Sequence, residues 1–394
     1  MWGRTCIPRK VYQVLFPFKR YFRCAQAQHF LVFCWLVVAL IRDPGKGTLK
    51  GLGTYLPSKL KYWTTLRMVR SGQWDAQGLM TAMAATMLHT LPPPLDGVLY
   101  LIGDSTLKAK RGQQHPLGHT TRHSEHDPYT FGFEMVLLIA SWDRFRIPLA
   151  LVPIDPQCRG HQNILFRQML KALVPPAWAR RVVLVADAGF AANETLRLIA
   201  AKKYAYVLAM PRTRKFTNGK HLRDMVQHLP KSFYYRRASD KPDGHRKDYW
   251  VLARRATLHN LGDVAIVLSK KRRHDGPKGV KIIVTNLTEA SAGEVLSIYA
   301  RRWGVEVTIK ELKSGLHLGQ MQVTKEAERV TRSVAPSVLA YPLLVRLYGH
   351  DEALCKEWSL FKLKERFAEE VAQDAVTRTE LKWQSKLKQY KHVA

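Results

Sequence analysis

The segment Tyr299–Lys313 places one acid among basic and aromatic side chains. Each residue of an α-helix turns by about 100°, so four of these residues share an arc of roughly 60° and two more lie at its edge. They are Tyr299, Arg302, Glu306 and Lys313, with Trp303 and Lys310 at the edge. Apolar residues collect on a separate stripe, which such a helix buries. The pattern predicts a carboxylate inside a cationic frame suited to a phosphate, although an ordinary solvated face is the alternative.

Two aspartates upstream follow short apolar runs that are typical of buried strands. Val98–Gly103 is followed by Asp104, and Arg181–Ala186 is followed by Asp187. An acid at the carboxyl end of a strand lies where open α/β sheets place their ligands. Either aspartate alone fits a turn or a cap equally well. Together with Glu306, however, they indicate a cluster of three carboxylates.

Such a cluster is suited to phosphodiester chemistry. Carboxylates bind hard divalent cations, and Mg²⁺ typically uses one or two of them together with phosphate oxygens. Two such ions activate the attacking oxygen and stabilise the leaving one. The predicted chemistry is therefore metal-dependent cleavage or transesterification of nucleic acid.

These residues resemble a known family. Asp104, Asp187 and Glu306 match the acidic triad of the DDE transposases of bacterial insertion sequences. Tyr299, Arg302, Glu306 and Lys313 fit the Y-x2-R-x3-E-x6-K signature of one branch at every position. The resemblance extends from about Gly97 to about Leu347.

The resemblance implies a ribonuclease H-like core and an enzyme that cuts and rejoins DNA at transposon ends. Asp104, Asp187 and Glu306 would be its catalytic residues and the ligands of two Mg²⁺ ions, with Mn²⁺ as an expected substitute. Tyr299 and Arg302 would hold a backbone phosphate near the transposon end, and Lys313 would assist. Two subunits would bring two ends together as a homodimer.

Composition agrees with a nucleic-acid partner. The chain of 394 residues carries 63 Lys and Arg against 31 Asp and Glu, a formal net charge of +32. A surplus of that size favours a polyanion through counterion release, whatever its base sequence. Charge alone also fits a ribosome-associated binder. Five cysteines without a C-x2-C pair indicate neither a zinc site nor a disulfide framework.

The apolar run Phe30–Ile41 is too short for a membrane span, which needs about 20 residues. We interpret it as a buried helix and expect a cytoplasmic, nucleoid-associated bacterial protein without a membrane partner. The fold class expected is α/β, a mixed sheet flanked by helices. Five segments follow from the breaks in composition: a helical DNA-binding domain (1–94), the first part of the core (95–210), a β-rich basic insertion (211–288), the second part of the core with the signature helix (289–350), and a helical C-terminal tail (351–394).

Further DNA contacts are expected outside the signature. A weak helix-turn-helix pattern in the first domain carries Lys59 and Lys61, and a basic loop after Asp104 carries Lys108, Lys110 and Arg111. Relatives place an aromatic residue of the insertion against a flipped-out base. Trp250 does not match the expected position, which makes Trp303 the better candidate, and Trp250 also fits an ordinary sheet position.

Four histidines, His115, His119, His123 and His126, lie among Pro and Gly without Cys partners, so we expect a loop near DNA rather than a zinc site. The C-terminal tail repeats apolar residues at helical spacing and fits docking on either the core or a second subunit. The sequence thus predicts a DNA transposase that binds dsDNA ends and target. A domesticated DNA-binding regulator and a nuclease or resolvase without strand transfer remain the alternatives.

Overall fold

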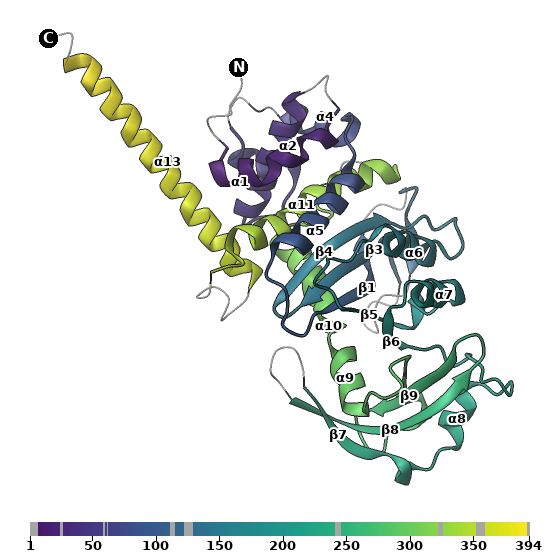
Figure 1. Cartoon of the computed structure of the whole chain (residues 1–394). Helices are drawn as coiled ribbons and strands as arrows, with labels where there is room; N and C mark the ends of the chain where they lie inside the picture. The colour runs from purple at the N-terminus through teal and green to yellow at the C-terminus, as the bar shows by residue number, and fades with distance from the viewer. Residues whose placement is uncertain are drawn as a thin grey trace. The chain divides into compact units, whose positions relative to one another are not determined.

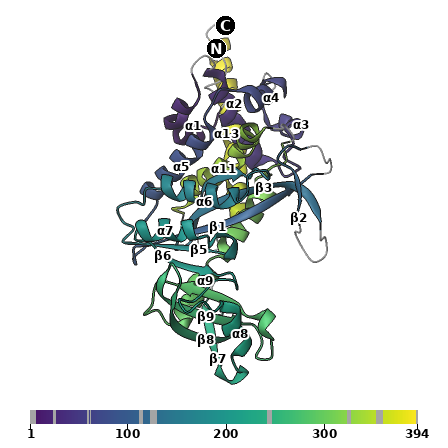
Figure 2. The same cartoon turned by 90° about the vertical axis from the view of Figure 1, so that its right-hand side faces the viewer.

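Contacts divide the chain into two units, one of which is built from both ends of the sequence. The helical unit comprises Met1–Met87 and Lys310–Ala394, and the sheet unit comprises Leu88–Ile309. The computed structural model (Figures 1 and 2) describes residues 7–23, 27–57, 60, 62–110, 115–121, 129–240, 246–321, 326–351 and 359–391.

The described strands of the sheet unit form one mixed sheet of ten strands. Its order is β2-β3-β1-β5-β6-β10-β9-β8-β7, and β4 pairs with β3. The first six strands are β1 (Val98–Ala109), β2 (His119–Thr121), β3 (Thr130–Trp142), β4 (Phe145–Pro153), β5 (Arg181–Ala186) and β6 (Ala205–Ala209). β5 runs parallel to both β1 and β6, while β3 runs antiparallel to β1. β3 and β4 form an antiparallel hairpin that turns at Asp143-Arg144.

The segment predicted as a β-rich insertion continues this sheet. Its strands are β7 (Tyr235–Asp240), β8 (Arg246–Leu258), β9 (Gly262–Lys270) and β10 (Lys281–Thr285). They pair antiparallel in succession, and β10 joins them to β6. The polypeptide therefore leaves the core at β6 and returns beside it.

Helices cover both faces of the sheet, and the alternation along β1 shows which face each one covers. The helices are α6 (His161–Ala172), α7 (Asn193–Ala201), α8 (Leu222–His228), α9 (Ala292–Ala300) and α10 (Trp303–Lys310). A Cβ at Gly103 would meet the ring of Phe166 in α6. A Cβ at Gly304 in α10 would come within 3.9 Å of Ile102 Cδ1. Neighbouring strand residues point to opposite faces, so α6 and α10 pack on opposite sides of β1, and Asp104 shares the α10 side with Ile102.

The helical unit is arranged around α11 (Ala327–Tyr348), which is buried along most of its length. Helices from the N-terminal segment and α13 (Leu360–Lys391) pack on it. The N-terminal elements are α1 (Arg9–Leu15), η1 (Phe16–Tyr21), α2 (Ala27–Arg42), α3 (Leu49–Leu52), η3 (Gly53–Tyr55), α4 (Tyr62–Ser71) and α5 (Ala76–Thr90). Leu360, Leu363 and Phe367 are buried, and α13 contacts α2, α11 and the π-helical turn η7 (Glu311–Gly315). The first residues of the apolar stripe predicted in the tail are thus buried against helices of the same chain.

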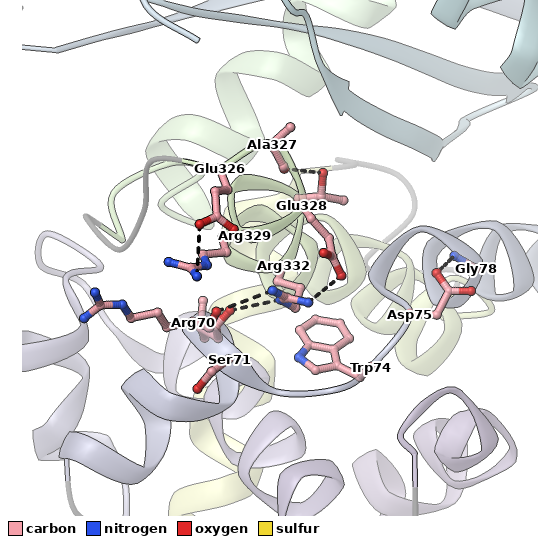
Figure 3. A network of polar contacts seen from close by, with 12 residues as sticks. Arg70, Ser71, Trp74, Asp75, Gly78, Glu326, Ala327, Glu328, Arg329 and Arg332 are labelled. Carbon is pink, nitrogen blue, oxygen red and sulfur yellow. Dashed lines mark hydrogen bonds and ion pairs between the residues drawn. The ribbon is translucent and has the colours of Figure 1, made fainter. Parts of the chain in front are cut away.

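Arg332 joins α11 to the end of α4 (Figure 3). Its Nε donates to the carbonyl oxygen of Val69 at 3.2 Å, Nη2 to that of Arg70 at 3.4 Å, and Nη1 to Glu328 at 2.6 Å. The last carbonyls of a helix have no partner within the helix, and a cation near them is favourable. Arg332 therefore links α4, in the N-terminal segment of the helical unit, to α11, in its C-terminal segment.

The predicted apolar helix Phe30–Ile41 is present as part of α2, and most of its residues are buried. In the part of the chain that the structure describes, no helix has the length and apolarity to cross a bilayer. The predicted helix-turn-helix region contains the short helices α3 and η3, followed by α4. Lys59 and Lys61 between them lie outside the described residues.

Candidate active site

The register of β1 places Asp104 next to Asp187. β1 pairs with β5 as far as Gly103, which lies opposite Ala186. The residues that follow these two are Asp104 and Asp187. The prediction that the first strand ends at Asp104 is wrong. β1 continues to Ala109 because its antiparallel partner β3 keeps bonding to it, with Asp104 opposite Leu137. The sequence correctly paired the two acids, but Asp104 marks the end of the parallel pairing and not of the strand.

Helix α6 fixes the backbone beneath both aspartates. Gly103 leaves room for the ring of Phe166, whose Cε2 would lie 2.3 Å from an added Cβ. Phe166 in turn contacts Phe190 with ring centroids 4.6 Å apart. Asn163 donates a hydrogen bond to the carbonyl oxygen of Gly189 at 2.9 Å. One helix thus supports the strand of Asp104 and the loop after Asp187.

Asp187 caps the short helix η4 (Ala188–Phe190) that follows it. Its Oδ1 accepts a hydrogen bond from the Gly189 N–H at 2.9 Å. This bond is local and holds the carboxylate in one orientation. The alternative reading of Asp187 as a cap is therefore correct for one oxygen, while Oδ2 makes no hydrogen bond among the described residues.

The signature segment is bent, contrary to the predicted single helix. α9 ends at Ala300, α10 begins at Trp303, and the π-helical turn η7 follows. The junction uses tighter i→i+3 hydrogen bonds, from Arg302 N–H to Tyr299 at 3.0 Å and from Gly304 N–H to Arg301 at 2.9 Å. A 3₁₀ turn advances each residue by more than an α-helical turn does. The predicted 60° arc therefore does not extend along the whole segment.

The bent segment crosses β1 with side chains in matching order. The Arg301 guanidinium lies over the Tyr100 ring at 4.2 Å from its centroid. Gly304 allows α10 to approach Ile102, and Arg302 reaches Asp104. Tyr100, Ile102 and Asp104 occupy one face of β1, since strand residues two apart point the same way. The bend thus aligns the signature with the strand that bears the first acid.

Arg302 connects two of the three acids. Its Nη1 donates to Asp104 Oδ2 at 3.1 Å, and its Nη2 donates to Glu306 Oε1. Arg302 and Asp104 are 18% and 17% exposed, so water screens this pair weakly. A guanidinium fork suits carboxylate pairs better than an ammonium does. The predicted gathering of Arg302, Asp104 and Glu306 is present.

Electrostatics places Asp187 and Tyr299 at the same site. The pKa of Asp104 is raised to about 6, mainly by burial and also by the charges of Asp187 and Glu306, while the Ser105 N–H and Arg302 oppose the rise. The pKa of Tyr299 is raised to about 12, again mainly by burial and also by Asp187 and Asp104, while Arg302 opposes the rise. Burial lowers the pKa of Arg302, but Tyr299, Glu306 and Asp104 outweigh it, so the pKa rises overall. The five side chains act on one another.

The donor set fits a divalent cation in its chemistry. The site offers hard carboxylate oxygens, and the pKa of Asp104 is raised mainly by burial and also by the charges of Asp187 and Glu306, so a bound cation would stabilise its ionised form. Among the described residues, however, no three His, Cys, Asp or Glu side chains are arranged as a metal cage. Arg302 holds one oxygen each of Asp104 and Glu306. Cation binding would therefore require Arg302 to release at least one of them.

The other predicted DNA contacts fall in different places. Trp303 is 62% exposed in the sheet unit. Lys310 ends α10 and Lys313 lies in η7, both within the helical unit, so their roles stay predictions. Arg111 lies outside the described residues.

Lys108 lies in the part of β1 that continues beyond Asp104, and Lys110 directly follows the end of that strand. Burial lowers the pKa of both, and Lys108 lowers that of Lys110 further. The Lys110 Nζ lies 5.2 Å from the Phe133 ring centroid. Two crowded ammonium groups of this kind are suited to a phosphate backbone.

Sequence reasoning missed Lys281. It is the first residue of β10, and its Nζ lies 5.1 Å from the centroid of the Tyr299 ring. No spacing rule links it to the signature, and its segment contains many basic residues. The one available signal was a basic residue directly before the apolar run Ile282–Val284.

The remaining aromatic and histidine candidates make local contacts. Trp250 in β8 stacks with the guanidinium of Arg273 at 5.1 Å. His115 stacks on Phe133 at 5.0 Å, and His119 Nε2 lies 3.8 Å from Glu134. His123 and His126 lie outside the described residues.

Comparison with known proteins agrees with this geometry. No protein with a curated description matches the chain. A solved structure that is similar is the "Cryo-EM structure of piggyBac transposase synaptic complex with hairpin DNA (SNHP)", with a TM-score of 0.54 and 10% sequence identity over 96% of this chain and 83% of that chain. This likeness confirms the predicted α/β fold with its helical N-terminal and C-terminal parts.

A family model described as "Transposase DDE domain" matches residues 101–335. The matched range includes Asp104, Asp187 and Glu306. Because it also covers more than half of the sequence, the chain belongs to the family of transposases with a DDE domain.

Proposed function

We propose that this chain is an insertion-sequence transposase that binds transposon ends, cleaves a DNA strand there and joins it to target DNA. The observation that carries the proposal is the fork of Arg302 on Asp104 and Glu306, with Asp187 in electrostatic contact. A cluster of acids held by one arginine at a strand edge is suited to a phosphate accompanied by cations.

Asp104, Asp187 and Glu306 would hold two Mg²⁺ ions, which Mn²⁺ would replace. When bound, such ions lower the pKa of the attacking oxygen and offset charge on the leaving one. Arg302 would then leave the carboxylates and donate to the non-bridging oxygens of the phosphate. Tyr299 keeps its phenolic proton near neutral pH, since its pKa is raised to about 12, and would donate a hydrogen bond there as well.

The proposed reaction has two phosphoryl transfers. In the first, water attacks phosphorus, and the bond to the 3′ oxygen breaks to leave a 3′-hydroxyl and a 5′-phosphate. In the second, that 3′-hydroxyl attacks a target phosphodiester and displaces the 3′ oxygen of the target strand. Both steps need the same in-line positioning of a phosphate, so one set of residues would serve both.

Sequence-independent affinity would come from the net charge of +32. For recognition of the transposon end we propose α4, where Tyr62 and Trp63 are 43% and 68% exposed and Arg67 and Arg70 lie on the same helix. Two such chains would bind two ends as a homodimer. Lys59 and Lys61, directly before α4, would add backbone contacts.

The test uses purified protein, Mg²⁺ and a duplex carrying the inverted repeat that flanks the gene. Wild-type protein should nick the duplex and, with pre-nicked ends, insert them into a plasmid. Asp104→Asn and Glu306→Gln should bind the duplex but do neither. If either variant still cleaves, the residue that it replaces is not a catalytic acid. Nicking without insertion would instead indicate a nuclease or resolvase, and binding without nicking in the wild type a regulator.

A further inference from the structure

Lys281 lies against the residue that opens the signature. Its Nζ is 5.1 Å from the Tyr299 ring centroid, and in the ladder Lys281 pairs with Ser269 of β9. Tyr299 is 8% exposed, so its ring is fixed by its surroundings. A lysine stem lying on a fixed ring loses much of its freedom, which places the ammonium group at the border of the site.

The charges around Lys281 are unbalanced. Its side chain makes no ion pair or hydrogen bond with any residue that the structure describes, and its ammonium group lies over the Tyr299 ring. Partial burial lowers the pKa of Lys281, and so do Arg302 and Lys271, whereas Glu306 and Asp187 oppose the change. Arg302 already neutralises part of Glu306. Two cations close enough to lower a pKa in this way are unfavourable until an anion joins them.

We propose that Lys281 contacts a DNA phosphate directly, on the same strand as the phosphate held by Arg302. The inference rests on the proposed function and adds one residue to it. An ammonium group without an acid partner, next to a guanidinium and exposed at the start of β10, is suited to non-bridging phosphate oxygens. Because Lys281 lies on the Tyr299 side of Arg302, its phosphate is a neighbour of the scissile one and not the scissile one itself.

A purely structural role for Lys281 is the competing explanation. In that case the side chain would only cover Tyr299, and any long apolar chain would replace it. Lys281→Met keeps the stem on the ring and removes the charge, whereas Lys281→Arg keeps the charge. A contact with phosphate predicts that arginine retains function and methionine loses it, and mere packing predicts the reverse.

The experiment measures single-turnover cleavage of an end duplex and the salt dependence of binding to it. Lys281→Met should cleave about 10- to 100-fold more slowly, and the slope of log K against log salt should fall by about one phosphate contact. Lys281→Arg should stay within a few-fold of the wild type. Lys220→Met is the matched control, because Lys220 is an exposed lysine of the same unit. Its cleavage rate should equal that of the wild type.

A second measurement identifies the phosphate. Single methylphosphonates are placed in turn on either side of the scissile linkage. At one position, neutralising the phosphate should slow the wild type but have no further effect on Lys281→Met. Additive effects at every position would overturn the proposal, and so would a Lys281→Met variant that matches Lys220→Met in both rate and salt slope.

The same data separate this proposal from the proposed function. Suppose that the wild type cleaves and Asp104→Asn does not. A Lys281→Met variant with an unchanged cleavage rate and salt slope would then reject only the proposed phosphate contact of Lys281 and leave the proposed function intact. If the wild type cleaves no end duplex, the proposed function fails. The salt slope of binding, and the loss of affinity caused by each methylphosphonate in the wild type and in Lys281→Met, still decide whether Lys281 contacts a phosphate.

Discussion

Asp104 Oδ2 accepts a hydrogen bond from Arg302 Nη1 at 3.1 Å, although the two residues are 198 positions apart in the sequence. The same guanidinium binds Glu306. Arg302 therefore supplies the positive charge that this group of acids requires before any cation or phosphate arrives. Its dual role leads to the first prediction.

Arg302→Ala should slow end cleavage by about 100-fold or more, the usual cost of removing one donor to a reacting phosphate or oxyanion. Bulk affinity for the duplex should fall by only a few-fold, since many other cations contact the backbone. Rates and affinities are measured by gel assays. Arg301→Ala is the matched control, because its guanidinium lies on Tyr100. Equal losses in rate and affinity for Arg302→Ala would indicate a general basic surface.

Asp104→Asn should make the metal-free protein more stable near pH 8. The pKa of Asp104 is raised from 3.8 to about 6 in the folded state. Its contribution to stability is therefore fully present below about pH 4 and is lost as the pH rises through 6. The ionised carboxylate then costs on the order of 3 kcal/mol. Denaturant unfolding in EDTA should show the gain at pH 8 and little difference at pH 4.

Mg²⁺ provides the control for that prediction. Adding it should raise the melting temperature of the wild type, because a ligand that binds the folded state stabilises it. The asparagine variant should respond less. A difference between the two proteins that stays constant from pH 4 to pH 8 would be inconsistent with a raised pKa at Asp104.

Gly103→Ala should lower the free energy of unfolding by about 1–3 kcal/mol, the usual cost of overpacking. The added Cβ would lie 2.3 Å from Phe166 Cε2, and Phe166 is fully buried. Cleavage should fall as well, since β1 carries Asp104 next in sequence. Combining it with Phe166→Leu should recover part of the loss, measured as a double-mutant cycle. Gly276→Ala, with nothing within 4 Å, should be nearly neutral.

Ser291→Ala should cost about 1 kcal/mol by removing the N-cap of α9. Ser291 Oγ accepts from the Glu294 N–H at 3.2 Å, and Glu294 Oε2 accepts from the Ser291 N–H at 2.7 Å. The Ser291 groups lower the pKa of Glu294 below 4.5, so its contribution is present above that pH and is lost in stronger acid. Thermal unfolding should show a larger effect of Glu294→Ala at pH 7 than at pH 3.

Local patterns were sufficient for much of the sheet and for part of the site. Short apolar runs predicted the strands that lead to Asp104 and Asp187, and the four-point spacing brought Tyr299, Arg302 and Glu306 together. These features depend on neighbours in sequence. The continuation of β1 past Asp104 depends on pairing with Phe133 and Gly132, which lie in another strand.

Features that depend on distant contacts were not predictable. The bend before Trp303 lets Gly304 approach Ile102, and nothing in the signature spacing encodes that approach. The sequence does not distinguish Lys281 from the other lysines of its segment, because its contact with the Tyr299 ring depends on the fold. Likewise, no periodicity shows that α2 packs on α11.

The packing of α2 on α11 has a consequence for biosynthesis. The apolar α2 leaves the ribosome early, whereas α11 is translated only after the entire sheet unit. Synthesis proceeds at roughly 5–20 residues per second, so the apolar helix α2 stays without its packing partner α11 for tens of seconds. The yield of native protein should therefore depend on translation speed and on chaperones that shield nascent chains.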